Sequence, residues 1–496
     1  MSRYILSIDQ GTSGTKCIIA DEQGRIVSKF TEPLKTTYLE GGLVEQDPEE
    51  IYTHVLAAVK GCTDAFIANG GNIADIKTCG ISNQRETFVL WDKQGEPLYN
   101  AVVWQCKRSV GVCRELETRG LKPEIKSKTG LLIDPYFSGS KVIWLYQYHT
   151  KVKQAIDAGE AYFGTVDTWL LYKLTGGRQY RTDYTNASRT LFFNLESLNW
   201  DKELLSQFGL ENLNLPNVQA SASAFGETDF EGILPSAMPV NAMIGDSHAA
   251  AFGEGCFEKG KAKATLGTGC SILINTGDIL PDGGEGMVGT ICWSTEKEVH
   301  YALEGVIVSC GSMVEWVKNE MGLFTDAAQT EAMATAVADN NGVYLVPAFS
   351  GLGAPHWDMS RKAEIYGLTF DCNRNHLVRA LLETIAFQIN EVIADMETKG
   401  QVQLKSLSLN GGMTGNRFVL QFLATLLGKQ LYHGNKDASA MGAAFLAGLK
   451  SGIFSDLQEI GVLIGEKPSI TPNIADQYPH QVFEQWQRYV LNSLMN

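Results

Sequence analysis

The chain has 496 residues, more than one hydrophobic core usually serves, so two domains are expected. Its 41 Lys and Arg against 56 Asp and Glu give a net charge of −15, which disfavours nucleic acid and anionic membranes as partners. The N-terminus lacks the pattern of a signal peptide and no run of 18 apolar residues occurs, which predicts a cytoplasmic protein. Ten cysteines stand without any CxxC pair and are expected to be reduced core thiols.

Strand and helix signals alternate along the chain, which predicts α/β layers. Residues 4–8 form an apolar run that ends at Asp9, and a second apolar stretch follows at 17–20. Asp47 and Pro48 predict the start of a helix, because Asp is a good N-cap and Pro fits the first helical position. The apolar face of that helix is Ile51, Val55, Val59, Cys62 and Phe66. Further helices are expected at 306–321, 376–396, 417–427 and 438–449.

A strand–turn–strand pattern occurs twice, about half a chain apart. The first is LSIDQGTSGTKCII, from Leu6, and the second is AKATLGTGCSILIN, from Ala262. The repeat indicates two similar domains that each offer backbone amides from a tight turn, although two unrelated hairpins would produce the same pattern. The boundary is weakly marked near 253–255, and we divide the chain into domains 1–252 and 253–496.

The turn of the first hairpin suits a nucleotide phosphate. Its glycines let the backbone approach closely, its hydroxyls and amides donate hydrogen bonds, and Lys16 adds positive charge. Asp9 at the strand end can hold Mg²⁺ directly or through water, since Mg²⁺ prefers oxygen ligands. The turn matches neither GxxxxGK[ST] nor GxGxxG after a strand, and hairpins use the same residues for geometry alone. The second turn, at 267–269, is a weaker signal of the same kind.

Two further segments carry candidate chemistry. Asp246 follows an apolar strand and precedes a small-residue helix, where ligands bind in open α/β sheets. A carboxylate there can take the proton of an attacking hydroxyl, but it can equally cap its helix. Arg85 and Glu86 lie between two apolar runs. Converged, they would grip vicinal hydroxyls; otherwise they form a surface ion pair.

Together these segments resemble the FGGY family of carbohydrate kinases, and within it the glycerol kinases. The matching segments run in order over nearly the whole chain and include DQGTSGTK (9–16), ISNQRETFVLW (81–91), AVVWQCKR (101–108), TGLLIDPYFSGSKVIWL (129–145), TDYTNASRT (182–190), GDSHAAAFG (245–253), LGTGCSILINTG (266–277) and LNGGMTGNRF (409–418). The resemblance implies an actin-like α/β fold of two ribonuclease-H-like domains, with ATP and substrate in the cleft between them.

The resemblance also implies a role for each matching residue. Asp246 is the expected general base, and Asp9 and Asp246 are the carboxylates expected near Mg²⁺. The residues expected to line the polyol site are Arg85, Glu86, Trp104, Tyr136, Asp246, Ser247 and Ser271. The residues expected around ATP are Thr12, Ser13, Gly14, Lys16, Gly267, Thr268, Gly311, Glu315, Gly412 and Asn416.

Some positions depart from the pattern of the glycerol kinases. Ser247 stands for a usual Gln and Ser271 for a usual Phe, and both exchanges remove side-chain volume from the polyol pocket. Lys16 replaces an Arg and so loses a bidentate fork, while Glu315 replaces a Gln and adds negative charge near the nucleotide. Residues 230–235 lack the Gly-Arg loop of members regulated by fructose 1,6-bisphosphate, so that control is not expected.

We therefore expect Mg²⁺-assisted phosphoryl transfer from ATP to a small polyol, with glycerol as the leading substrate and glycerol 3-phosphate as product. A four- or five-carbon polyol or ketose is the alternative within the family, because of the enlarged pocket. A distant alternative is an actin-like ATPase without a sugar substrate, but such a protein would not need the NQRET, WQC and IDPYFSG segments. A catalytically inactive sensor is disfavoured because Asp9 and Asp246 are both present. A homodimer or homotetramer is the expected assembly, without nucleic acid or membrane partners.

Overall fold

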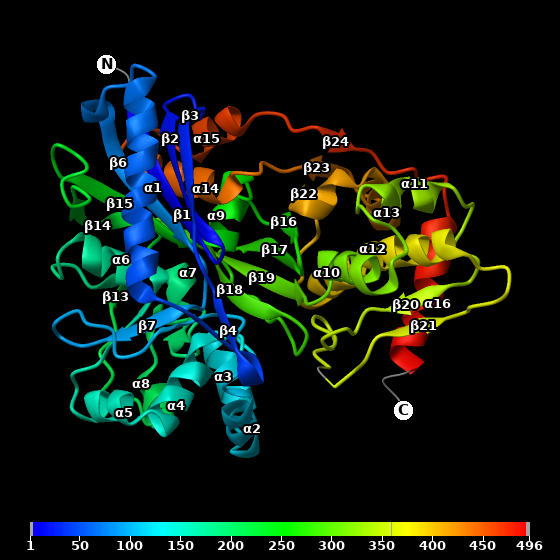
Figure 1. Ribbon diagram of the computed structural model, residues 1–496, viewed down its shortest axis with the longest axis horizontal. Helices are drawn as coiled ribbons and strands as arrows, with labels where there is room; N and C mark the ends of the chain where they lie inside the picture. Colours follow the sequence, from blue (N-terminus) through cyan, green and yellow to red (C-terminus); the bar gives the residue numbers. More distant parts are fainter. Residues whose placement is uncertain (1–2, 359, 493–496) are drawn as a thin grey trace.

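The computed structural model describes residues 3–358 and 360–492 and contains two large mixed sheets, one in each half of the chain (Figure 1). The first has the order β14-β15-β6-β1-β2-β3. Its strands are β1 (Tyr4–Gly11), β2 (Gly14–Asp21), β3 (Ile26–Pro33), β6 (Ile76–Asn83), β14 (Ala222–Thr228) and β15 (Met238–Gly245). The second has the order β18-β19-β17-β16-β22-β23-β24. Its strands are β16 (Lys261–Leu266), β17 (Cys270–Gly277), β18 (Val288–Ser294), β19 (Val299–Ile307), β22 (Ser406–Asn410), β23 (Leu431–His433) and β24 (Ser469–Ile470).

The two sheets repeat one arrangement around the two predicted hairpins. Strand β1 pairs antiparallel with β2 and parallel with β6, and β16 pairs antiparallel with β17 and parallel with β22. The next strands also correspond, because β2 pairs antiparallel with β3 and β17 does so with β19. The hairpins therefore occupy equivalent places in two similar sheets, which confirms the predicted duplication.

Helices cover both faces of the first sheet. Helix α1 (Pro48–Ala68) begins as predicted, with the Asp47 carboxylate accepting the N–H of Glu49 at 2.9 Å, and it lies against β2 and β3. Side chains alternate along β1, because successive residues of a strand point to opposite faces. Leu6 and Ile8 pack on the α1 side, whereas Ile5 packs on the opposite side.

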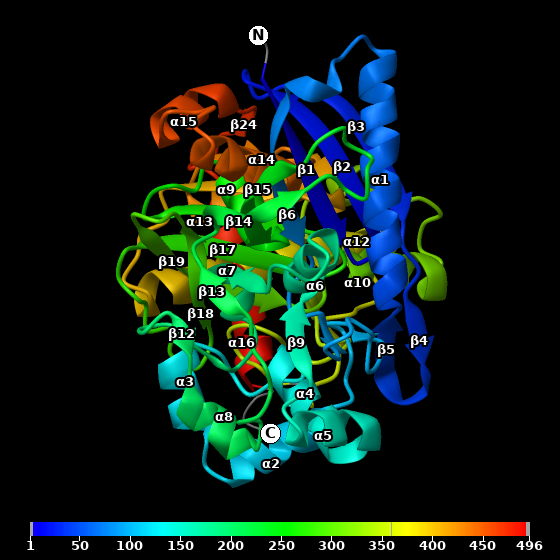
Figure 2. The same cartoon turned by 90° about the vertical axis from the view of Figure 1, so that its left-hand side faces the viewer.

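That opposite side is covered by α9 (Asp246–Gly253) and by α14 (Ala438–Lys450), which comes from the far end of the sequence (Figures 1 and 2). The two helices touch through glycines. A Cβ on Gly442 would lie 1.9 Å from the carbonyl oxygen of Ala249, and one on Gly253 would lie 2.2 Å from that of Ala438. No larger residue fits at either position. The second half of the chain thus completes a layer of the first sheet.

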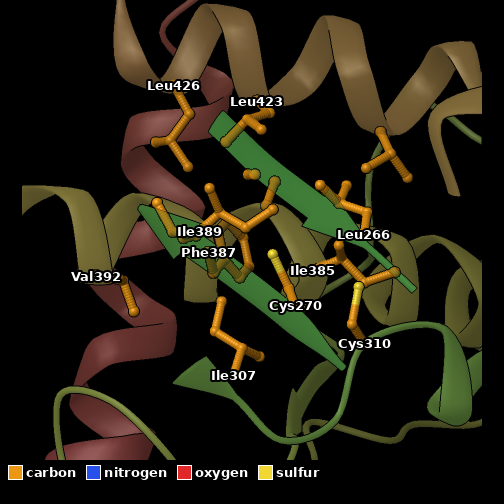
Figure 3. Packing of buried hydrophobic residues seen from close by; sticks show 14 of the residues in the cluster. Leu266, Cys270, Ile307, Cys310, Ile385, Phe387, Ile389, Val392, Leu423 and Leu426 are labelled. Atoms are coloured by element: carbon orange, nitrogen blue, oxygen red, sulfur yellow. The ribbon is translucent and has the colours of Figure 1, made fainter. Parts of the chain in front are cut away.

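The core of the second half lies between the sheet and three helices: α12 (Arg374–Lys399), α13 (Arg417–Leu427) and α16 (Tyr478–Asn492). In Figure 3, Leu266 and Cys270 from the sheet meet Phe387 and Ile389 of α12 and Leu423 of α13. The predicted helices at 376–396, 417–427 and 438–449 are confirmed by α12, α13 and α14.

The predicted helix at 306–321 is wrong in its first part. Val306 and Ile307 end β19, and α10 (Gly311–Trp316) starts only after them and continues into a π-helical turn, η3 (Val317–Met321). A short apolar run cannot be assigned to strand or helix by periodicity alone. Here Val306 and Ile307 form a strand because they pair with β17.

A smaller sheet and several short helices extend the first half. The sheet has the order β4-β5-β8-β7-β9. Its strands are β4 (Thr37–Leu39), β5 (Leu43–Gln46), β7 (Phe88–Trp91), β8 (Ala101–Val102) and β9 (Tyr162–Thr165). The helices are α2 (Val110–Thr118), α3 (Lys122–Thr129), α4 (Ser138–Tyr148), α5 (Thr150–Asp157), α6 (Val166–Leu174), α7 (Tyr184–Ala187) and α8 (Lys202–Phe208).

The remaining elements are short. Three strand pairs are β10 (Arg181–Asp183) with β13 (Asn217–Gln219), β11 (Phe193–Asn194) with β12 (Asn199–Trp200), and β20 (Tyr344–Val346) with β21 (Glu364–Tyr366). Helices α11 (Gln329–Thr335) and α15 (Leu457–Ile464) complete the second half. The ten cysteines are free. Nine of them are buried, as predicted for core thiols, whereas Cys372 is half-buried and lies outside the core. Within 3–358 and 360–492, no helix is both long and apolar enough to cross a membrane.

Candidate functional site

Asp246 lies where β15 ends and α9 begins, and the N-cap of that helix is Gly245 rather than Asp246. Its Oδ1 accepts the N–H of Ser247 at 2.6 Å and lies 3.2 Å from Nε of Arg85. No described residue donates to Oδ2, and 38% of the side chain is exposed. One carboxylate oxygen is therefore held in place while the other is open to an incoming hydroxyl.

Arg85 follows β6 and reaches Asp246 because residue 245 is a glycine. A Cβ there would lie only 2.7 Å from Cγ of Arg85. The guanidinium donates from Nη1 and Nη2 to the two carboxylate oxygens of Glu304, at 3.0 and 2.7 Å. Glu304 belongs to β19 and is 0% exposed, so this bidentate pair joins the two halves inside the protein. The surface ion pair considered for Arg85 and Glu86 is not what forms.

Glu86 pairs with Arg189, which follows α7. Nε of Arg189 donates to Oε1 of Glu86 at 2.6 Å, and its Nη2 lies 2.7 Å from Oε2 of Glu304. Burial opposes ionisation of Glu304, but Arg189 and Arg85 outweigh it and hold the pKa of this carboxyl well below its usual range. Burial raises the pKa of Glu86 against the pull of the same two cations. Two cations and two carboxylates thus form one buried network beside Asp246.

Sequence reasoning assigned no role to Arg189 or Glu304. A signal for Glu304 existed, because a lone carboxylate in the apolar strand YALEGVI is expensive to bury unless it is paired. Arg189 is the only basic residue of the segment TDYTNASRT at 182–190. Neither pattern predicts that Arg189 and Glu304 contact each other, because the two residues lie in different halves of the chain.

An aromatic pair stands next to this network. The rings of Trp104 and Tyr136 meet edge to face, with centroids 5.6 Å apart, and the guanidinium of Arg189 lies 5.9 Å from the Tyr136 ring. Nε1 of Trp104 donates to Oγ1 of Thr12 at 2.9 Å, which ties Trp104 to the first hairpin. Among the described residues, the Tyr136 hydroxyl has no hydrogen-bond partner, so it remains available to a ligand.

The two serines that depart from the family pattern lie in different surroundings. Oγ of Ser271 donates to Oε1 of Glu304 at 2.9 Å, which places Ser271 directly on the charged network. Ser247 is half-buried in the first turn of α9, beside Asp246.

The first hairpin brings Asp9 and Lys16 opposite each other on β1 and β2. Nζ of Lys16 lies 3.9 Å from Oδ2 of Asp9 and 3.1 Å from Oδ1 of Asp437, a residue just before α14 that sequence reasoning missed. Burial raises the pKa of Asp9 to about 6; Lys16 opposes this rise and Asp246 adds to it. An added cation would therefore stabilise the ionised form of Asp9.

The turn of this hairpin is held by its neighbours while its tip is free. The carbonyl of Thr12 accepts from Nε2 of Gln46 at 2.7 Å, and Ser13 at the tip is exposed. A Cβ on Gly14 would lie 2.7 Å from the carbonyl oxygen of Glu32, so β3 approaches the turn only because that residue is glycine.

The residues of the second half that are predicted to surround the nucleotide contact one another mainly through their backbone. The N–H of Gly311 donates to the carbonyl of Gly267 at 2.9 Å, and a Cβ on Gly311 would lie 2.6 Å from that oxygen. The carbonyl of Thr268 accepts the N–H of Ser312 at 3.0 Å. Gly412 begins a 3-10 turn, η4 (Gly412–Gly415), and has no atom within 4 Å of a would-be Cβ. The start of α10 and the second hairpin turn are thus joined, beside open space at Gly412.

Two predicted nucleotide residues are already engaged elsewhere. Glu315 is exposed and pairs with Lys318 one turn along the helix. Asn416 is the N-cap of α13: its Oδ1 accepts the N–H of Val419 at 3.1 Å, and its Nδ2 donates to Thr330 at 3.0 Å. Because both ends of the Asn416 amide have partners, its contact with a nucleotide stays a prediction, as does that of Glu315.

Comparison with known proteins agrees with this geometry. Residues 4–253 match the N-terminal domain and residues 262–451 the C-terminal domain of the FGGY family of carbohydrate kinases. A glycerol kinase of Carboxydothermus hydrogenoformans is 42% identical over 490 residues, 98% of this chain and 97% of that protein. Glycerol kinase 2 of Thermotoga maritima is 41% identical over 494 residues, 99% of each chain.

Solved structures share the fold over the full length. The structure of Plasmodium falciparum glycerol kinase with ADP has a TM-score of 0.93 at 35% identity and covers 100% of this chain and 99% of its own. A xylulose kinase from Lactobacillus acidophilus has a TM-score of 0.88 at 22% identity, covering 99% of this chain and 98% of its own, which is a likeness of fold alone. The two-domain, actin-like fold expected from the sequence is confirmed. This chain belongs to the FGGY family of carbohydrate kinases.

Proposed function

We propose that this kinase transfers the γ-phosphate of ATP to glycerol and forms glycerol 3-phosphate and ADP. The observation that carries the proposal is the carboxylate of Asp246, with one oxygen held by Ser247 and Arg85 and the other open. Full-length relatives at about 40% identity are named glycerol kinases, which supports glycerol as the acceptor.

The residues around Asp246 can bind a small polyol by matching its hydroxyls. Arg85 and Glu86 are fixed by Glu304 and Arg189, so their remaining hydrogen-bonding capacity is pre-oriented. The rings of Trp104 and Tyr136 cover carbon atoms, and the Tyr136 hydroxyl is a further polar contact. Asp246 takes the proton as the substrate oxygen attacks phosphorus, and ADP leaves with the electrons of the broken P–O bond.

The nucleotide is proposed to lie between the two hairpins. Thr12, Ser13, Gly14 and Lys16 offer hydroxyls, amides and a charge from the first hairpin. Gly267 and Thr268 of the second hairpin and Gly311 at the start of α10 border it from the other side. The N–H groups of Gly267 and Gly311 already donate to main-chain carbonyls and so shape this turn, and Gly412 leaves room beside it. Backbone N–H groups in tight turns are effective phosphate donors.

The carboxylates present fit Mg²⁺. Burial raises the pKa of Asp9, and the nearby charge of Asp246 adds to this rise. Mg²⁺ commonly binds through one or two such carboxylates together with water and substrate phosphates. Bound there, Mg²⁺ would neutralise phosphate oxygens.

A second candidate substrate is a four- or five-carbon polyol or ketose. It is favoured by Ser271, whose side chain is tied to Glu304 and brings no ring to the pocket. A coupled assay of ADP release across three- to five-carbon polyols and ketoses tests both. The highest kcat/KM with glycerol supports the proposal; a higher value with a longer acceptor favours the second candidate, and release that no acceptor stimulates contradicts both.

Other expectations stay predictions. They are the division into domains 1–252 and 253–496, a homodimer or homotetramer, and a cytoplasmic location. Sedimentation of the purified protein measures the assembly.

A further inference from the structure

Lys141 lies in the first turn of α4 and its side chain is completely buried. Its Nζ donates to three successive carbonyl oxygens, those of Pro135 at 2.6 Å, Tyr136 at 2.7 Å and Phe137 at 3.2 Å. None of the ion pairs among the described residues includes Lys141. The ammonium group is therefore satisfied by main chain alone.

This placement is unfavourable for a cation in two respects. The group is removed from water, and it stands near the positive end of the α4 dipole. Burial lowers the pKa of Lys141 to about 8, although the groups that face it from neighbouring segments, Glu86, Cys106, Asp134 and Cys113, pull in the other direction. A buried apolar residue would avoid both costs, so the charge needs a reason other than packing.

The three carbonyls belong to the turn that carries Tyr136. The same turn is held on its other side by Asp134, whose Oδ1 accepts the N–H of Tyr136 at 2.7 Å. Between these two anchors the Tyr136 ring meets Trp104 on one side and Phe137 on the other, edge to face in both contacts. Its hydroxyl stays without a partner among the described residues.

We propose that Lys141 is a positioning residue for the acceptor substrate: it fixes the main chain at 135–137 so that the Tyr136 hydroxyl points at the polyol. This inference rests on the proposed function, because it takes the acceptor to be the ligand of Tyr136. The family resemblance assigns no role to this lysine.

The positioning role of Lys141 depends on its protonation. A lysine ammonium has three N–H donors for three carbonyls, whereas the neutral amine has two, so one carbonyl loses its donor when Lys141 deprotonates. As pH rises through about 8, the turn loosens. The KM for the acceptor then rises, while the KM for ATP, which binds elsewhere, does not follow it.

The test compares Lys141→Met with Lys126→Met. Lys126 in α3 is a matched control, because burial also lowers its pKa to about 8 and its Nζ donates to two carbonyls, those of Gly130 and Met287, outside the acceptor site. At pH 7, Lys141→Met is expected to lower kcat/KM for glycerol by about tenfold or more, through KM. Its KM for ATP stays within about twofold, and Lys126→Met changes neither constant by more than that.

The pH profile is the second readout. The acceptor KM of the wild type is expected to rise between pH 7 and 9, and that of Lys141→Met to be high already at pH 7 and flat. Equal acceptor KM values for the two variants, or an ATP KM that rises in parallel, would overturn the proposal. If Lys141→Met does not fold, the wild-type profile decides: an acceptor KM that stays flat to pH 9 overturns it.

The proposed function is tested separately, by wild-type turnover. If the wild type turns over a longer polyol and not glycerol, the proposed function fails. The comparison of the lysine variants is then made with that polyol and decides the role of Lys141 independently.

Discussion

The proposed acceptor side and the proposed nucleotide side of the candidate site are built from different kinds of contact. Next to Asp246, side chains of both signs are buried and paired, with Glu304 at the centre of the contacts. Near the second hairpin, by contrast, the contacts run through glycine backbone, and Thr268 and Gly412 are exposed.

We attribute the difference to the two proposed ligands. A small neutral polyol offers few contacts, so its side of the site needs side chains that are oriented before it arrives. A triphosphate carries its own charge and meets backbone N–H groups in tight turns, which need close approach more than side chains. On the acceptor side, substitutions that keep the shape of a side chain but remove its charge should therefore impair activity. On the nucleotide side, replacement of a glycine by alanine should be enough to impair ATP binding.

The largest effect is expected from Asp246→Asn. The amide keeps the shape of the carboxylate but cannot accept a proton, so kcat should fall by about 10²- to 10⁴-fold. Steady-state kinetics at saturating acceptor measure the loss, and calorimetric titration with ATP should show nearly unchanged binding. A variant that keeps more than half of the wild-type rate would contradict the assignment of Asp246 as base.

Glu304→Gln should be the most damaging change to the buried network. It leaves Arg85 and Arg189 in the interior with one carboxylate fewer, and removing one partner from a buried pair costs about 3–5 kcal/mol. The thermal midpoint and the acceptor KM measure the effect on folding and on the site.

Glu383→Gln is the matched control for that variant. Glu383 is also fully buried and paired with an arginine, Arg379, but burial raises its pKa, so its ionised form is less favoured than that of Glu304. It lies in the second-half core, where Tyr478 also donates to it. Glu383→Gln should lower the thermal midpoint less than Glu304→Gln does. Equal decreases in the midpoint would show that the charge of Glu304 is not the cause of its effect on stability.

Gly311→Ala tests the nucleotide side. The added Cβ would lie 2.6 Å from the carbonyl oxygen of Gly267, so the start of α10 must move away from the second hairpin turn. Forcing a group into a packed site costs about 1–3 kcal/mol, which should appear in the KM for ATP rather than in that for the acceptor. Gly415→Ala is the control, because no atom lies within 4 Å of a Cβ at that position, and it should leave both KM values nearly unchanged. An acceptor KM that rises as much as the ATP KM would argue against the separation.

The smallest effect is expected from Ser271→Phe. A ring fills space beside Glu304, so kcat/KM should improve for glycerol and worsen for four- and five-carbon polyols, each by about 1–3 kcal/mol. Ser271→Ala removes the hydrogen bond to Glu304 without adding a ring. It therefore separates the effect of losing that hydrogen bond from the effect of filling the pocket. If Ser271→Phe shifts neither ratio, this residue does not face the substrate and the longer-acceptor alternative loses its support.

Much of the local structure was determined by the sequence alone. Asp47 and Pro48 set the start of α1, and the apolar periodicity set α13 at 417–427, because caps and amphipathic patterns act between near neighbours. The two hairpins were recognisable for the same reason. Motifs also located Arg85, Trp104 and Asp246, each at the end of an apolar run.

Only the tertiary structure decided which distant residues meet. Arg85 and Glu304 are 219 positions apart, and the carboxylate of Asp437 reaches Lys16 from before α14, a helix that covers the sheet of the other half. Local pattern carries no information about such pairs. A charged side chain in a strand shows that a partner must exist, because burial without one is too costly, but the packing of the two halves selects that partner.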